Sequence, residues 1–254
     1  MSIDQVVACR ILGKGEDLVL LHGWGTNSFI WQEVELSLGQ HFRVHLIDLP
    51  GFGSSSALST YTLSSMLEAI VKVVPDQAIW CGWSLGGLLA TYASYAYPHK
   101  VKKLIQVCSA LKFVSENAFE GVDSAIFENF KMNLKKNKDK TLKRFMSFQT
   151  QGPSTAREDI RSMKGSLGVS FVANEAALLG GLCLLQETDL RECFTQIKQP
   201  CLSIFGAYDA LIPKQGITQI KILLAHSQQV IFEKSAHAPF ISEREYFCRL
   251  IKAF

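Results

Sequence analysis

A serine flanked by glycines is the first residue of this chain whose type and context point to chemistry. The segment Gly82-Trp83-Ser84-Leu85-Gly86 fits the pattern GxSxG and stands between an apolar strand pattern (78–81) and a helical pattern (about 85–97). A sharp strand-to-helix turn strains the serine backbone and points its oxygen away from the sheet, while the glycines relieve crowding. We therefore predict Ser84 as a nucleophile; the alternative is an ordinary strand–helix turn.

A serine hydroxyl is a poor nucleophile until a base takes its proton. When a GxSxG serine begins such a site, the acid and then the histidine follow it in the chain, each after a later strand. Asp209 follows a strand pattern at 201–205, and His237 follows another at 229–232. We predict the triad Ser84, His237 and Asp209, with Asp189 as the alternative acid.

Two N–H groups must stabilise the oxyanion that forms when a serine attacks an ester. The backbone N–H of Leu85, directly after the nucleophile, is the first expected donor. The second should come from the loop after an early strand, and there we select Trp24, whose indole either lines an acyl pocket or packs in the core. His22 is interpreted as a hydrogen-bonding residue that shapes this loop, and Asp48 as the residue that pins its own turn.

Strand and helix patterns alternate along most of the chain, which is typical of a mostly parallel sheet flanked by helices. The expected strands span residues 18–21, 42–47, 78–81, 103–108, 201–205 and 229–232. From 112 to 186 the apolar period becomes helical. The sequence therefore predicts an α/β core domain, 1–111 with 187–254, and a helical cap inserted at 112–186.

Composition limits the possible partners. The chain has 254 residues, 48% hydrophobic and 19% charged, and its net charge of +3 argues against a nucleic-acid binder. It begins without a signal-peptide pattern, and no apolar stretch approaches the ~20 residues that span a bilayer. We expect a cytoplasmic monomer with no membrane partner. Seven cysteines, an odd number without a CxxC pair, predict free thiols and no zinc site.

Positive charge is concentrated in one part of the predicted cap. From Lys131 to Lys164 ten Lys or Arg residues face only Asp139, Glu158 and Asp159, a balance of +7. Because the whole chain carries +3, the remainder carries −4.

Four segments together resemble a known family. They are 21–25 (LHGWG), 48–53 (DLPGFG), 80–87 (WCGWSLGG) and 236–242 (AHAPFIS). They are similar to the α/β-hydrolase-fold esterases of the biotin pathway, which cleave pimeloyl-[acyl-carrier protein] methyl ester. The likeness covers nearly the whole chain, including 144–149 (RFMSFQ) and the glycine pair 180–181.

The resemblance implies a reaction and a set of substrate contacts. Ser84 would attack the methyl ester, His237 would accept its proton with the support of Asp209, and no metal or organic cofactor would be required. The family's substrate-contacting positions correspond here to the following residues: Trp24, Ser84, Leu85, Phe145, Met146, Ser147, Phe148, Gln149 and His237.

The resemblance also gives the basic cap a meaning. Acyl-carrier proteins are acidic, and a tethered substrate needs a basic docking surface. Lys140 with Arg144, and Arg157 with Arg161, are each spaced i, i+4 and so share one helix face. We predict that these four residues bind the acyl-carrier protein; the alternative is an ordinary solvated helix face. Two other functions stay open, a general short-chain carboxylesterase and a non-catalytic binding module of the same fold.

Overall fold

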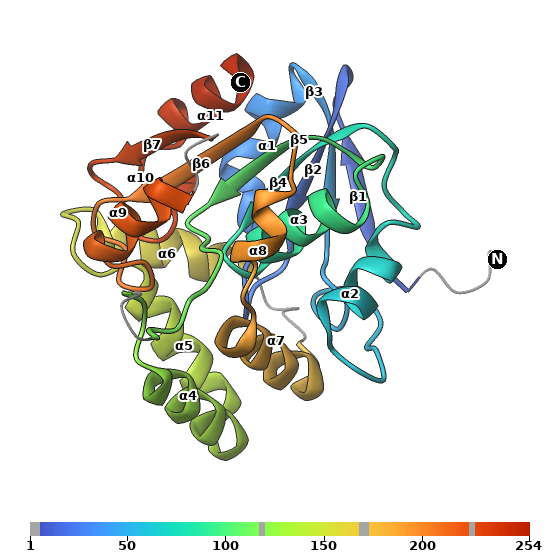
Figure 1. Cartoon of the computed structure of the whole chain (residues 1–254). Helices are drawn as coiled ribbons and strands as arrows, with labels where there is room; N and C mark the ends of the chain where they lie inside the picture. Colours follow the sequence, from blue (N-terminus) through green and yellow to red (C-terminus); the bar gives the residue numbers. More distant parts are fainter. Residues whose placement is uncertain (1–5, 117–119, 168–172, 224–226) are drawn as a thin grey trace.

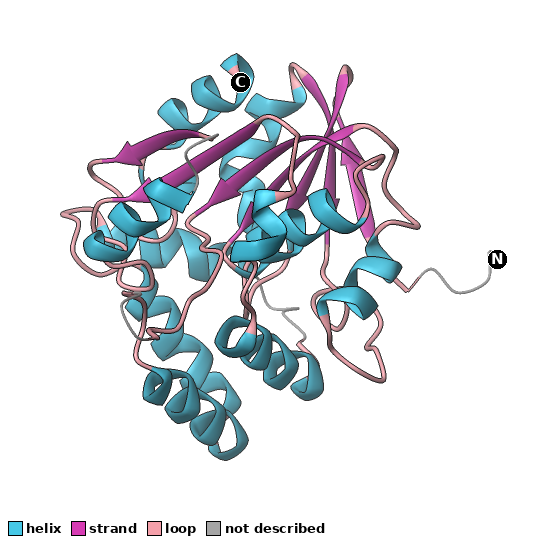
Figure 2. Cartoon of the chain, in the orientation of Figure 1, coloured by secondary structure: helices cyan, strands magenta, loops and turns pink. Residues whose placement is uncertain are grey.

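A seven-stranded sheet forms the centre of the molecule (Figures 1 and 2). The computed structural model describes residues 6–116, 120–167, 173–223 and 227–254. The strands follow the order β1-β3-β2-β4-β5-β6-β7, and only β1 runs antiparallel to its neighbour. Their bounds are β1 Cys9–Leu12, β2 Glu16–Leu21, β3 Phe42–Ile47, β4 Ala78–Trp83, β5 Val101–Val107, β6 Cys201–Gly206 and β7 Gln228–Phe232.

The predicted α/β fold with a mostly parallel sheet is confirmed, and each of the six expected strands is present within about two residues of its predicted ends. The sequence analysis missed β1, which lies at the sheet edge. Its four residues are only partly covered, so they show neither a buried run nor a clear alternation. The predicted strand 103–108 is also shifted: β5 ends at Val107, and Cys108 lies in the turn beyond it.

Alternate residues of each central strand face opposite sides of the sheet, as strand geometry requires. On β2, Val19 and Leu21 belong to one buried cluster, whereas Leu18 and Leu20 belong to the other. Helices cover both faces (Figure 1). They are η1 Ser28–Trp31, α1 Gln32–Gly39, α2 Leu63–Ile70, α3 Leu85–Ala96, α8 Arg191–Thr195, α9 Lys214–Leu223, α10 Pro239–Ser242 and α11 Arg244–Ala253. None of the helices in the described residues is long and apolar enough to span a bilayer.

Among the described residues, four helices lie between β5 and α8, where the cap is predicted. They are α4 Ser124–Lys136, α5 Lys138–Gln149, α6 Ala156–Leu167 and α7 Glu175–Glu187. Side-chain oxygens of Asp123, Asn137 and Asn174 accept N–H groups at the starts of α4, α5 and α7, as good N-caps do. Residues 117–119 and 168–172 of this segment lie outside the described residues. The division into core and cap stays a prediction.

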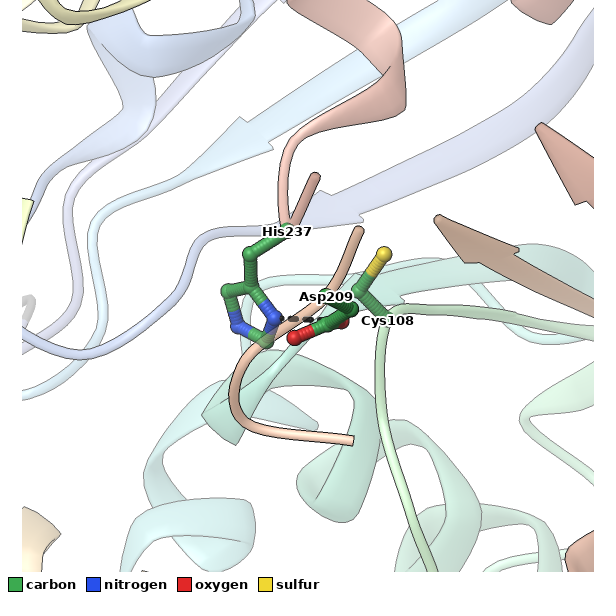
Figure 3. Close-up of side chains that lie close together, drawn as sticks. All are labelled: Cys108, Asp209 and His237. Carbon is green, nitrogen blue, oxygen red and sulfur yellow. Dashed lines mark hydrogen bonds and ion pairs between the residues drawn. The ribbon is translucent and has the colours of Figure 1, made fainter. Parts of the chain in front are cut away.

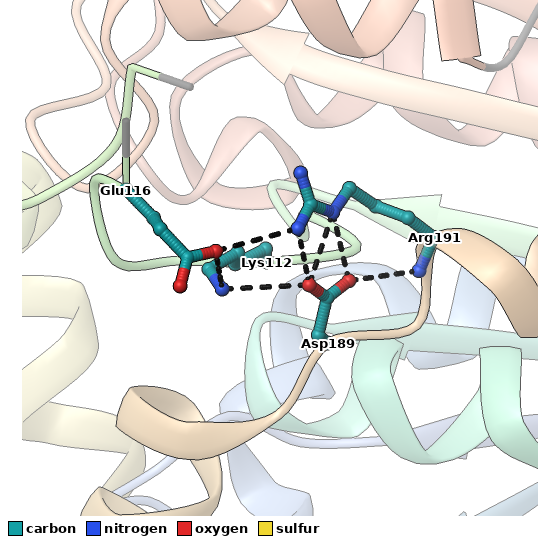
Figure 4. A network of polar contacts seen from close by, with 4 residues as sticks. All are labelled: Lys112, Glu116, Asp189 and Arg191. Carbon is teal, nitrogen blue, oxygen red and sulfur yellow. Dashed lines mark hydrogen bonds and ion pairs between the residues drawn. The ribbon is translucent and has the colours of Figure 1, made fainter. Parts of the chain in front are cut away.

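An ion-pair network joins the chain segments that enter and leave these helices (Figure 4). Lys112 Nζ lies 2.6 Å from Glu116 Oε2 and 3.4 Å from Asp189 Oδ2. Arg191 Nη2 lies 2.5 Å from Asp189 Oδ2 and 3.5 Å from Glu116 Oε2. The guanidinium of Arg191, hydrogen-bonded to Asp189, is the main reason why the pKa of that carboxyl falls to about 2. Asp189, the alternative acid of the sequence analysis, is therefore paired with Lys112 and Arg191, beside the chain segments that enter and leave the four helices.

Candidate active site

Ser84 occupies a strained turn between β4 and α3. Its φ of 54° and ψ of −116° lie outside the regions that residues with side chains prefer, which is the backbone expected of a nucleophile elbow. Gly82 and Gly86 make this turn possible. A Cβ at Gly82 would collide with the Gly86 carbonyl, and one at Gly86 would collide with the Leu21 carbonyl of β2. The predicted reason for both glycines is confirmed.

Asp209 and His237 form a buried hydrogen-bonded pair (Figure 3). His237 Nδ1 lies 2.7 Å from Asp209 Oδ2, and both side chains are inaccessible to solvent. The other carboxylate oxygen, Oδ1, accepts the N–H groups of Leu211 (2.8 Å) and Ile212 (3.1 Å). Because these bonds fix the carboxylate, they also fix the imidazole with Nδ1 as the donor and Nε2 as the free base.

The backbone of His237 is held by two further contacts. Its N–H donates to the Gln149 carbonyl at the end of α5 (3.1 Å), and its carbonyl accepts the Trp83 indole N–H (2.7 Å). Trp83 precedes the predicted nucleophile, and Gln149 lies in the predicted substrate segment. The loop of the histidine is thus connected both to the elbow and to α5.

Ser84 Oγ and His237 Nε2 are buried atoms without a hydrogen-bond partner in the described part of the chain. The structure therefore contains the bond between Asp209 and His237 but not the one between Ser84 and His237. Such bonds are often long without substrate and tighten when it binds. The two atoms that a proton transfer would join carry no competing bonds.

Trp24 and Leu85, the predicted oxyanion residues, meet at α7. The indole Nε1 of Trp24 donates to the Leu178 carbonyl at 2.7 Å. Its ring packs edge-to-face on Phe145 of α5, with centroids 4.7 Å apart. A Cβ at Gly181 would approach both Trp24 and Leu85, so this glycine lets α7 lie directly against the loop. The N–H of Leu85 lies in the first turn of α3, where helical N–H groups have no acceptor within the helix.

His22 is fully buried and hydrogen-bonds within the loop that is predicted to supply an oxyanion donor. Its Nε2 accepts the N–H of Leu49 (2.9 Å), so Nδ1 carries the proton and donates to the Gly23 carbonyl (2.8 Å). Burial lowers the pKa of His22, which keeps it neutral. Asp48 accepts the N–H groups of Ser28 and Ser54, each at 2.8 Å, and thereby ties its own turn to η1.

Five consecutive residues of α5 were expected to contact substrate, but a helix turns by ~100° per residue and points them in different directions. Phe145 and Gln149 are four residues apart and so lie on the same face of α5. Phe145 packs on the Trp24 ring, and the backbone carbonyl of Gln149 accepts the N–H of His237. Phe148 is half-buried beside the same apolar cluster. Met146 packs in the other cluster, and the Ser147 hydroxyl donates to the Lys143 carbonyl of its own helix. Phe145 and Gln149 are thus the best placed of the five.

The four predicted docking residues are exposed, Lys140 and Arg144 on α5 and Arg157 and Arg161 on α6. Within the described residues, none of the four has a carboxylate within 4.0 Å. The positive charges of these four residues are therefore available to a partner. The position of α6 is fixed by a hydrogen bond to the helix that follows His237, in which the hydroxyl of Ser242 of α10 donates to the buried Asp159 (2.7 Å).

A third side chain lies beside the Asp209–His237 pair, and the sequence analysis assigned it no role. Cys108 Sγ, an Asp209 carboxylate oxygen and a His237 ring nitrogen all lie within 4.8 Å of one another (Figure 3). This is the one group of three such donors found among the described residues. Burial and the nearby carboxylate raise the pKa of the Cys108 thiol well above its usual value, so it is a poor metal ligand. The signal in the sequence that could have identified Cys108 was its position directly after β5, because the parallel strands end at the sheet edge where Ser84, Asp209 and His237 lie.

The fold and site place the chain in a known family. A family model described as alpha/beta hydrolase fold matches residues 18–244, and the chain belongs to this family of hydrolases. A relative from Vibrio vulnificus (strain CMCP6) is 39% identical over 242 residues, 95% of each chain, and one from Salmonella newport (strain SL254) is 40% identical over 240 residues, 94% of each. Both are named pimeloyl-[acyl-carrier protein] methyl ester esterase. The chain belongs to that family of esterases and is a carboxylic-ester hydrolase.

Solved structures with lower sequence identity share the fold. An esterase from Exiguobacterium antarcticum superposes with a TM-score of 0.87 at 23% identity, over 97% of this chain and 94% of that one. The enol-lactonase from Burkholderia xenovorans LB400 gives 0.81 at 21%, over 96% and 94%. At this distance the likeness supports the fold alone.

Proposed function

We propose that this protein hydrolyses the methyl ester of pimeloyl-[acyl-carrier protein] to pimeloyl-[acyl-carrier protein] and methanol, a step of biotin biosynthesis. The observation that carries the proposal is the buried Asp209–His237 pair at the same sheet edge as the strained Ser84. The substrate comes from the names of relatives that are 37–40% identical over nearly the whole chain.

The reaction follows from the groups present. Ser84 Oγ attacks the ester carbonyl carbon while His237 Nε2 takes its proton, and Asp209 stabilises the resulting imidazolium. The oxyanion is held by the N–H groups of Trp24 and Leu85, each worth ~3–4 kcal/mol of barrier. The imidazolium then protonates the departing methoxide. Water, activated by His237, releases the acyl group, so the cycle closes without a cofactor.

The acyl chain is proposed to lie between Trp24 and α5. Phe145 packs on the Trp24 indole, and the buried Gln149 amide has no partner among the described residues. Ser84 and His237 are both fully covered, from which we infer a closed state of the site. Entry of a carrier-tethered ester requires the side chains above Ser84 to move, and we place that movement in α4 and α5.

Lys140, Arg144, Arg157 and Arg161 are proposed to dock the acidic carrier protein. All four are exposed, and none forms an ion pair with a carboxylate of the described residues. They lie on α5 and α6, and α5 also carries Phe145, which packs on Trp24. Seven free cysteines agree with a reducing compartment, and we propose a cytoplasmic monomer whose macromolecular partner is the carrier protein. With a net charge of +3, we expect no nucleic-acid partner, and we expect no membrane partner.

Charge reversal tests the docking surface. In the double variant Arg144→Glu/Arg161→Glu we expect kcat/KM for the tethered ester to fall ~10-fold or more at low salt and much less at high salt, because rim charges act mainly on association. Kinetics with free pimeloyl dimethyl ester should not change.

The matched control is Lys14→Glu/Lys72→Glu, which changes net charge equally at exposed lysines near β1 and α2. Docking by the cap is contradicted if both double variants behave alike. A fluorophosphonate probe that labels wild type but not Ser84→Ala would identify the nucleophile, whereas a binding module without an activated serine would not react.

A further inference from the structure

The turn after β5 contacts both halves of the predicted triad. It consists of Cys108 and Ser109, both buried. The N–H of Cys108 donates to the Ile204 carbonyl of β6 (2.8 Å), and the N–H of Ser84 donates to the Val107 carbonyl of β5 (3.0 Å). Cys108 has a φ of 43°, in the left-handed region that glycine prefers. The sheet therefore holds a side-chain-bearing residue in an unfavourable backbone conformation at this edge.

The Cys108 thiol faces the acid–base pair. Its Sγ donates to the carbonyl of Ala236, the residue before His237, at 3.8 Å, and lies within 4.8 Å of the Asp209 carboxylate (Figure 3). Burial and this carboxylate keep the thiol protonated, since they raise its pKa well above the usual value. The group behind Asp209 is therefore a neutral S–H donor.

The oxygens of a buried carboxylate need hydrogen-bond donors, because a charge without hydrogen bonds is costly in the protein interior. Asp209 Oδ1 accepts two backbone N–H groups, and Oδ2 accepts His237 Nδ1. The thiol of Cys108 lies beside this carboxylate, and its one proton is shared between the Ala236 carbonyl and the carboxylate. It is therefore a weak additional donor next to the buried charge.

Ser109 contacts the nucleophile's half of the site. Its hydroxyl donates to the carbonyl of Ser84 at 2.9 Å, in the first turn of α3. Gly87 of α3 lies so close that a Cβ there would collide with the Ser109 side chain. One dipeptide thus fixes the elbow through Ser109 and the acid–base pair through Cys108.

We propose that Cys108 and Ser109 are positioning residues that set the alignment of Ser84 with the Asp209–His237 pair, with Cys108 also tuning the proton affinity of the pair. This proposal rests on the proposed function of the triad. Neither residue touches the reacting atoms.

The test is the pH profile of kcat/KM for a free short-chain p-nitrophenyl ester, whose acid limb reports the base of the free enzyme. Without the thiol, the carboxylate loses a weak hydrogen-bond donor and interacts more strongly with the imidazolium of His237. In Cys108→Ala we therefore expect the acid limb to rise by ~0.3–0.5 pH unit and kcat to fall ~10-fold, short of the ~100-fold that a 1 Å misplacement costs. Cys108→Ser supplies a hydroxyl donor and should return the acid limb to its wild-type position or below.

Ser109→Ala should separate the two roles. We expect ~10-fold lower kcat and slower fluorophosphonate labelling of Ser84, with an unmoved acid limb. The matched controls are Cys81→Ala, a buried thiol of β4, and Ser94→Ala, whose hydroxyl donates to Ala90 on the same helix α3. Both controls should lower the melting temperature without changing kcat or the acid limb.

The proposal is overturned if Cys108→Ala keeps wild-type kcat and pH profile, or if the Cys81 control shows the same changes. If Cys108→Ala does not fold, Cys108→Ser decides: an acid limb at or below the wild-type position supports the proposal, and a raised one overturns it. Wild-type protein without any Ser84-dependent ester hydrolysis would instead refute the proposed function, so the two failures are distinguishable.

Discussion

Replacing Gly181 with alanine should disturb the predicted oxyanion loop from the cap side. An added Cβ would lie 2.6 Å from Trp24 Cδ1 and 3.2 Å from both Trp24 Nε1 and Leu85 Cδ2. The indole cannot turn away freely, because Nε1 is bonded to the Leu178 carbonyl and the ring packs on Phe145. Either α7 or Trp24 must therefore shift.

The change in the free energy of unfolding is set by three terms, one that favours alanine and two that oppose it. Alanine in a helix is favoured over glycine by about 1 kcal/mol. Overpacking costs ~1–3 kcal/mol, and a weakened bond to a buried indole N–H costs about 1–3 kcal/mol. We expect a net loss of ~1–5 kcal/mol, equivalent to a fall of roughly 2–20 °C in melting temperature for a chain of this size. We expect kcat to fall ~10–100-fold, below the ~10²–10³ that complete loss of one oxyanion donor costs.

Gly165→Ala on α6 is the matched control, because a Cβ there meets no atom within 4 Å. It should stabilise the protein by up to ~1 kcal/mol without changing kcat. Thermal melts and steady-state kinetics on a free methyl ester measure both quantities. The reasoning is refuted if Gly181→Ala is stabilised like Gly165→Ala and keeps its kcat, since α7 would then not hold Trp24.

Three further predictions concern ionisable groups. Asp209→Asn should lower kcat by ~10³–10⁴ with the fold intact, because the amide no longer holds the required tautomer of His237. Asp189→Asn should keep the wild-type kcat. Equal losses of kcat in the two variants would contradict the assignment of the acid. Because the native pKa of Asp189 is about 2 against 3.8, its pairing with Arg191 stabilises the fold above pH ~4, and this contribution is lost as pH falls toward 2. Asp189→Asn should therefore lower the free energy of unfolding by at most ~1 kcal/mol at neutral pH, since the ion pair is partly exposed. In urea melts, the difference in stability between wild type and this variant should shrink between pH 4 and 2.5. A difference that stays constant with pH would exclude the ion pair as its cause. In ¹⁵N NMR the His22 ring should stay the neutral Nδ1–H tautomer down to a lower pH than an exposed imidazole does, because burial lowers its pKa. A ring that titrates like an exposed histidine would contradict the proposed loop geometry.

Much of the site could be predicted because chain order carries geometric information in a parallel sheet. The carboxyl ends of the parallel strands meet at one edge, so residues that follow β4, β6 and β7 are brought together whatever their separation in sequence. Ser84, Asp209 and His237 each follow such a strand. The GxSxG pattern added the backbone constraint, because only glycines fit beside the Gly86 and Leu21 carbonyls.

The features that sequence did not reveal depend on tertiary packing. β1 is too short to show a period, and its partner β3 comes some thirty residues later. The bond from Trp24 to Leu178 spans 154 residues and uses a backbone carbonyl, which has no signature in the sequence. Cys108 was assigned to a strand as a small apolar residue, yet a strand one residue shorter turns its thiol toward Asp209.

The most direct measurement is turnover of pimeloyl-[acyl-carrier protein] methyl ester beside the free methyl ester, with wild type and Ser84→Ala. The account predicts fast cleavage of the tethered ester, a clear preference over the free one, and loss of both activities in Ser84→Ala. Cleavage of free short-chain esters alone would contradict the proposed substrate, since it would describe a general short-chain carboxylesterase with an ordinary solvated cap.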